Sequence, residues 1–426
     1  MFNNLAFAIQ FAGFGNILLA LVVLLFMITI HELGHYTAGK LLKFKINEFA
    51  IGMGPKIFSR KTKSGETVSL RVLPLGGFCA FEGENEEGDN ACSFNKQKPW
   101  KRIVVLFSGA LFNFVSALLI AVVVFSCYGD TVMTVNKVYE YAVVENQVLQ
   151  PGDIIYKVDG KEVYLAANFS AYVKNEEFDL VVIRDGQEVE LKGLKYTNYV
   201  TTSVLGCTID PSKNVSDDKT HSIVAGDTLY KIDGYLIIGE GGYQRAISAA
   251  GDKVVVEVVT AEGKHVTFSD FDKADLASLT PIEKSYSGIG ISTIYSKMKY
   301  SFVDSLLRAV PYCLQLAWFI LQSLGGIITG AVGLADVGGP LTTISVASQV
   351  VASGFGNVLS LIVMISVNLA VFNLLPVPAL DGCQIIFVLI EAIRKKPINR
   401  KVQGLINTIG LVVLMIFVVM IDLVKL

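Results

Sequence analysis

Long apolar runs alternate with polar segments along the chain, and four of these runs are long enough to cross a membrane. A spanning helix needs about 20 apolar residues. Residues 16–30 with their apolar flanks supply the first, and residues 103–127, 356–375 and 402–421 supply the other three. The pattern therefore predicts a polytopic α-helical membrane protein with about four transmembrane helices.

The charges between these runs orient the predicted helices. Residues 39–102 carry twelve Lys and Arg against seven Asp and Glu, and a short basic loop follows at residues 394–401. Residues 128–300 carry 17 Lys and Arg against 25 Asp and Glu. Because basic loops face the cytoplasm, we expect both basic loops inside, and both termini and the acidic insert outside.

A fifth apolar run, residues 309–335, is interrupted by Pro311, Gly325, Gly326 and Gly330. If this run crossed the membrane alone, the basic loop at residues 394–401 would lie outside, against the positive-inside rule. We therefore expect residues 301–355 to form an interfacial or half-inserted segment on the outer side.

Composition excludes several other classes of protein. Hydrophobic residues make up 52% of the 426 residues and charged residues 17%, whereas ordinary soluble domains carry about 25% charged residues. The sequence has no basic stripe of the kind that would indicate a nucleic-acid partner. The six cysteines form no C-x-x-C pair, which argues against a disulfide scaffold and against zinc held by paired cysteines.

The acidic insert contains an internal repeat. The nine residues 152–160 recur, with substitutions, at residues 226–234, a spacing of 74. Each copy reads as a short strand between turn signals, and further alternating runs follow it. We therefore expect two small β-rich modules of similar size.

The motif that most clearly indicates chemistry is His31-Glu32-Leu33-Gly34-His35, which lies at the end of the first predicted helix. Residues i and i+4 lie on one helix face about 5–6 Å apart, so two imidazoles there can hold one metal ion. Glu32 lies beside them, where it can take a proton from metal-bound water. Ionisable groups inside a bilayer are costly and usually functional, so we interpret this motif as a metal site.

A catalytic zinc usually has a third protein ligand. His221 and His265 lie in the external insert, so the remaining candidates are Asp336 and Asp381. The predicted depth in the membrane favours Asp381, which follows the third helix at the cytoplasmic side, where the first helix also ends. Asp336 is expected near the opposite face.

These motifs together resemble the site-2 protease family, and in detail its bacterial regulator-of-sigma-E type. The resemblance rests on two motifs. One is His31-Glu32-x-x-His35, and the other is Asn373-x-x-Pro376-x-Pro378-x-Leu380-Asp381-Gly382. The resemblance covers most of the chain. It extends to residues 52–55 and 69–78, which match a membrane-associated β-hairpin, and to residues 109–114 and 338–340. The chain departs from the family pattern at Ala110, where proline is usual, and at Cys383-Gln384, where Gly-His is common.

The resemblance implies a zinc endopeptidase of the bacterial cytoplasmic membrane that cuts transmembrane segments. Its substrates would be single-span membrane proteins already trimmed by another protease, with lipid as the surrounding partner. The ligands of Zn²⁺ would be His31, His35 and Asp381, with Glu32 as general base and acid. The organisation that follows is residues 1–128, membrane core with the β-hairpin; 129–200 and 201–300, two PDZ-like modules; 301–355, the interfacial segment; and 356–426, membrane core.

Substrate contacts are predicted at two places. The strand-like residues 66–75, with Leu70 and Val72 in their alternating pattern, could pair with an unwound substrate by β-strand addition. Asn373 and Asn368 could hold other parts of the substrate backbone.

Two further classes of function stay open at this point. One is a membrane scaffold whose modules bind partners, although a scaffold has no need of the base Glu32. The other is a metal transporter, which the small number of intramembrane histidines and carboxylates disfavours.

Overall fold

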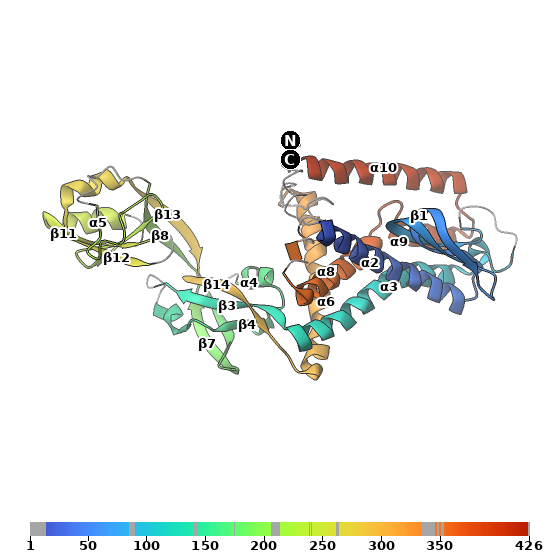
Figure 1. Ribbon diagram of the computed structural model, residues 1–426, viewed down its shortest axis with the longest axis horizontal. Coiled ribbons are helices and arrows are strands. Elements are labelled where there is room, and N and C mark those ends of the chain that lie inside the picture. The colour runs from blue at the N-terminus through green and yellow to red at the C-terminus, as the bar shows by residue number, and fades with distance from the viewer. Residues whose placement is uncertain are drawn as a thin grey trace. The chain divides into compact units, whose positions relative to one another are not determined.

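The structure is a computed structural model that describes residues 14–84, 90–139, 144–173, 175–205, 214–237, 239, 241–260, 264–331, 333, 346, 349–350 and 353–424. It divides into two units (Figure 1). Residues 1–130 and 297–426 form the membrane unit, and residues 131–296 form the insert. The charge-poor and charge-rich parts of the sequence thus separate into different units.

The membrane unit is built on long apolar helices. Five of them, among the described residues, have the length and composition of a membrane span. The four expected spans correspond to α2 (Phe14–Leu41), α3 (Pro99–Val123), α8 (Phe355–Asn373) and α10 (Arg400–Val424). The fifth is α6 (Phe302–Thr329), which falls in the segment expected at the interface. Length and composition thus admit α6 as a further span.

Two of these helices show why they begin where they do. Pro99 occupies the first turn of α3, where its missing N–H costs no hydrogen bond. Ser301 caps α6 by accepting a hydrogen bond from the Asp304 backbone N–H, and the helix ends at Gly330, which has a φ of 75°. Pro311 lies inside α6 without ending it.

The expected hairpin is formed by β1 (Ile46–Lys61) and β2 (Thr67–Phe81), but it is folded further than a simple hairpin. The first part of β1 pairs with both ends of β2, as Ile51 with Gly77 and with Leu70. Leu70 also pairs with Phe58. Gly52 and Gly76 have φ values of 84° and 89° and allow the two strands to bend. The result is a small sheet with 77–81 and 56–61 as its outer segments.

The insert contains two antiparallel sheets, as its alternating sequence predicts. The first has the order β14-β3-β4-β6-β7, and the second has the order β12-β11-β9-β8-β13. The strands of the first are β14 (Ile291–Met298), β3 (Asp130–Val138), β4 (Ile154–Val158), β6 (Glu177–Arg184) and β7 (Gln187–Lys195). Those of the second are β12 (His265–Asp272), β11 (Lys253–Val259), β9 (Thr228–Ile232), β8 (Thr197–Val204) and β13 (Pro281–Gly288).

The two copies of the repeat take the same local structure. β4 and β9 each end in a tight turn with two positive φ values, at Asp159-Gly160 and at Asp233-Gly234, and each pairs with the short strand that follows it. A helix then follows in both copies, α4 (Ala166–Tyr172) and α5 (Gly242–Ala249). Each sheet covers its own apolar core.

The two sheets are not simply consecutive along the chain. β14 follows the last strand of the second sheet and yet pairs beside β3 in the first. Thr134 and Ser296 join these two strands by a hydroxyl–hydroxyl hydrogen bond. The second sheet is therefore inserted between strands of the first, which a sequence repeat alone does not reveal.

Candidate metal centre

Two histidines of α2 form one half of the site. His31 and His35 are only 8% and 7% exposed. Their Nε2 atoms lie 3.1 Å apart, and their rings meet edge to face. The i, i+4 spacing thus brings two imidazole nitrogens to one point on the helix surface, as the sequence predicts.

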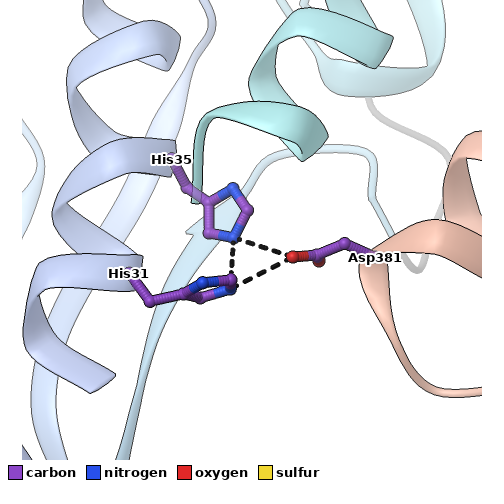
Figure 2. Close-up of side chains that lie close together, drawn as sticks. All are labelled: His31, His35 and Asp381. Carbon is purple, nitrogen blue, oxygen red and sulfur yellow. Dashed lines mark hydrogen bonds and ion pairs between the residues drawn. The ribbon is translucent and has the colours of Figure 1, made fainter. Parts of the chain in front are cut away.

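Asp381 supplies the other half from the opposite end of the chain. It is the first residue of α9 (Asp381–Arg394), directly after the turns that contain Pro376 and Pro378. Its Oδ2 lies 3.1 Å from His31 Nε2 and 3.4 Å from His35 Nε2. Figure 2 shows the carboxylate pointing toward the two imidazole rings. The break after α8 therefore turns the carboxylate toward the two histidines.

This donor set fits a divalent metal ion. One ligand atom from each of the three residues lies within 4.8 Å of the others. A tetrahedral zinc with bonds of about 2.0–2.1 Å would hold its ligand atoms about 3.3 Å apart, close to the distances found. Moreover, the buried Asp381 Oδ2 makes no hydrogen bond within the described part of the chain. A buried carboxylate oxygen without a hydrogen bond is costly, and a bound cation would offset that cost.

Glu32 belongs to α2, and its side chain lies close to β2. A methyl group built on Gly77 would lie 3.4 Å from Glu32 Cγ, so β2 passes close to this side chain. The sheet thus holds the acid beside the two histidines without making it part of the three-residue cluster.

Helix α3 packs against the two histidines of α2. A Cβ atom on Gly34 would collide with the Ser108 carbonyl, and one on Gly109 would lie 2.5 Å from His35 Nε2 and 2.7 Å from His31 Cε1. His35 Nδ1 makes a 2.8 Å hydrogen bond with the Val105 carbonyl. Glycine at these two positions therefore lets α2 and α3 meet closely enough to support the ligands.

Two asparagines approach His31 on its other nitrogen. The side-chain amides of Asn113 and Asn373 each lie 3.4 Å from His31 Nδ1. Asn113 is fully buried, whereas Asn373, the last residue of α8, is half-buried. The predicted substrate residue Asn373 thus lies at the site.

The other predicted substrate residues are not brought to the metal ligands by any contact found among the described residues. Asn368 is exposed on α8, five residues before Asn373. Leu70 and Val72 are 44% and 52% exposed on β2. Leu70 has strand partners on both sides, so its backbone is already used within the sheet.

A buried ion pair that the sequence analysis missed fixes α9. Arg102, at the start of α3, donates a 2.6 Å hydrogen bond to Glu391 near the end of α9, and both side chains are buried. Glu391 also accepts a hydrogen bond from the Ile398 backbone N–H. Because α9 begins with Asp381, this pair holds the helix that carries the third ligand against the helix that supports the first two.

The two remaining histidines lie in the insert and have partners there. His221 Nε2 lies 2.8 Å from Asp227 Oδ2, and the His265 ring packs edge to face on Tyr230. The alternative ligand Asp336 and the Gly338-Gly339-Pro340 motif lie outside the described residues.

Comparison with known proteins agrees with this site. Residues 19–417 match the model of Peptidase family M50. A Clostridium perfringens protein named "Putative zinc metalloprotease" is 32% identical over 401 residues, which cover 94% of this chain and 95% of that protein. The "Regulator of sigma E protease" of Haemophilus influenzae is 27% identical over 445 residues, which cover 94% and 95%. The chain therefore belongs to peptidase family M50, the site-2 protease family, and is a metalloprotease.

Proposed function

We propose that this metalloprotease is a zinc-dependent endopeptidase that cuts the transmembrane segments of single-span membrane proteins. The observation that carries the proposal is the convergence of His31, His35 and Asp381 beside Glu32, in a unit built from helices of membrane-spanning length. His31, His35 and Asp381 would hold the zinc ion, which leaves its fourth position open.

The chemistry divides between the metal and one side chain. When bound, zinc acts as a Lewis acid toward the scissile carbonyl and lowers the pKa of water at the site to about 7. Glu32 accepts the proton of the attacking water and returns it to the leaving amine.

The substrate must be unwound before it can react, because a helical segment hides its peptide bonds in its own hydrogen bonds. The sheet offers a strand for pairing with an extended peptide. Leu70 pairs with a strand segment on each side and so lies inside the sheet. Residues 77–81, by contrast, form an outer segment next to Glu32. We therefore assign strand addition to 77–81 and leave side-chain contacts to Leu70 and Val72. Asn373 would hold the substrate backbone at the metal, and Asn368 would hold it further along α8.

The proposed topology follows from charge. We infer that the basic loops face the cytoplasm of a bacterial cell, with the PDZ-like insert and both termini outside and α6 at the outer interface. The exposed apolar side chains of α6, such as Phe302, Leu307 and Trp318, suit contact with lipid. A buried ion pair of Arg308 with Asp130 fixes α6 to the first residue of β3.

The direct test is Glu32→Gln in the purified full-length protein. The variant keeps all three ligands, so it should bind zinc like the wild type and lose cleavage of a single-span substrate by at least a hundredfold. Glu145→Gln, the same change at an exposed position of the insert, should leave both unchanged. Membranes of cells carrying Glu32→Gln should accumulate trimmed single-span proteins. Normal turnover by Glu32→Gln would contradict the mechanism and favour a scaffold.

A further inference from the structure

The fully buried Asn113 has an unsatisfied atom at the metal centre. Its side chain is 0% exposed, and its Oδ1 makes no hydrogen bond within the described part of the chain. Its amide lies 3.4 Å from His31 Nδ1, at the long end of the hydrogen-bond range. A buried amide oxygen without a partner costs about 1–3 kcal/mol, so its position next to a ligand calls for an explanation.

The proton on His31 supplies that explanation. His31 Nε2 faces Asp381 and His35, so Nε2 is the nitrogen that would bind a metal ion, and Nδ1 then carries the proton. An N–H needs an acceptor, and an amide NH₂ group cannot accept. A 180° turn of the amide exchanges its oxygen and nitrogen. Only with Oδ1 toward His31 do both the Nδ1–H and the buried oxygen have a partner.

The second histidine has the same arrangement. His35 Nδ1 is 2.8 Å from the Val105 carbonyl, which can only accept. Val105, Gly109 and Asn113 are spaced by four residues along α3, so they lie on one helix face, opposite His35 and His31. Helix α3 thus presents one acceptor to each ligand, with Gly109 between them to allow the approach.

We propose that Asn113 is a positioning residue that accepts a hydrogen bond from His31 Nδ1–H and so holds Nε2 toward the metal. Metal-binding histidines usually donate their second N–H in this way, and loss of the acceptor costs 10–100-fold in metal affinity or activity. Asn373, which reaches the same nitrogen, is half-buried, and the proposed function assigns its amide to the substrate. This inference rests on the proposed function, because it takes zinc as the ion held by His31.

The test measures how fast a chelator removes zinc from the purified full-length protein. Asn113→Leu, which has nearly the same volume but no acceptor, should release zinc 10–100-fold faster than the wild type. Asn113→Asp keeps an acceptor and should release zinc no faster than the wild type. The matched control is Asn357→Leu, which removes a half-buried amide at the start of α8 that bonds Ser353 and should change the release rate by less than about twofold.

The Asn113→Asp variant decides the matter even if Asn113→Leu does not fold. If the Asn113 amide instead donated to an unprotonated Nδ1, a carboxylate at this position would repel that nitrogen and speed zinc release. Faster release from Asn113→Asp than from the wild type would therefore overturn the assignment, as would unchanged release from Asn113→Leu. A wild-type protein that binds no zinc would contradict the proposed function itself, which distinguishes the two failures.

Discussion

The insert and the membrane unit both bury charged side chains, but they use them in different ways. In the insert, Asp153 and Asp227 occupy equivalent places in the two repeats, and each is 1% exposed. Asp153 accepts hydrogen bonds from the Gln150 backbone N–H and, at 2.7 Å each, from Nε and Nη2 of Arg184. Asp227 accepts one from the Val224 backbone N–H and lies 2.8 Å from His221. Each acid is thus satisfied by partners within its own module.

The membrane unit arranges its two buried histidines and the half-buried Asp381 differently. His31 and His35 come from α2 and Asp381 from α9, and the carboxylate oxygen between them has no hydrogen bond in the described structure. Buried polar groups with nearby partners stabilise a fold. Groups that converge on one point from distant segments, and leave a carboxylate oxygen there without a hydrogen bond, indicate a ligand.

The largest expected effect comes from crowding the site. Gly109→Ala would place a methyl group against both imidazoles, so the ligands must move. We expect zinc content to fall and cleavage to drop at least a hundredfold, since catalytic geometry tolerates shifts of well under 1 Å. Zinc analysis and a cleavage assay on the purified protein measure both.

The control for this change is Gly404→Ala on α10, where a methyl group meets no atom within 4 Å. That variant should keep full zinc and activity and gain up to about 1 kcal/mol of stability, because alanine favours a helix. Equal behaviour of the two variants would show that α3 does not support the ligands.

The matched change in the insert is Asp153→Asn. It removes the negative charge and one of the two acceptor oxygens that face Arg184, and should lower the stability of the first β-module by about 1–3 kcal/mol. The loss is limited because Arg184 is partly exposed and water can replace part of it. Limited proteolysis of the full chain measures the effect. Asp185→Asn, on the exposed turn of the same hairpin, is the control. Loss of zinc from Asp153→Asn would contradict the separation of the two units.

A smaller effect is expected at the sheet of the membrane unit. Glu66, 3% exposed, binds Lys40 at 2.6 Å and Tyr36 at 3.0 Å. Burial raises the pKa of Glu66, but the hydrogen bonds from Lys40, from its own backbone N–H and from Tyr36 outweigh this and lower it to about 2. The stabilisation is therefore complete above the ordinary pKa of about 4.5 and is lost as the pH falls through about 2.

Pepsin, which is active at low pH, can follow this loss. Cleavage within β1 and β2 should increase as the pH falls from 4 to 2. The Glu66→Gln variant, which cannot ionise, should be cleaved faster at pH 4 and change little below it. A wild-type protein cut equally at both pH values would show that Glu66 does not fasten the sheet to α2.

The smallest effect is expected from the histidines of the insert. His221→Ala and His265→Ala should each leave zinc content and cleavage unchanged, because both side chains have their contacts within the insert. Metal analysis of each variant is sufficient. Zinc lost from either one would mean that the insert contributes to the metal centre.

Much of the site could be predicted from the sequence because its signals are local. The spacing of His31 and His35 follows from the helical period, and Asp381 stands out as a carboxylate after a long uncharged run. The four expected spans follow from the bilayer thickness. The repeat at residues 152–160 and 226–234 likewise predicted matching strands, which the structure confirms.

The rest depends on contacts that no local pattern encodes. The double pairing of Leu70 requires both strands to bend at glycines. The return of β14 to the first sheet and the Arg102–Glu391 pair both join segments far apart in sequence. Val105 acts through its backbone carbonyl, so its side chain gives no signal at all.

The central claim is that Asp381 completes a zinc site with His31 and His35. It is tested most directly by zinc analysis of the purified wild type and of Asp381→Asn, with the cleavage assay on the same samples. The wild type should hold one zinc ion per chain, and Asp381→Asn should lose zinc and cleavage together. Full zinc and full cleavage in Asp381→Asn would place the third ligand elsewhere and contradict the claim.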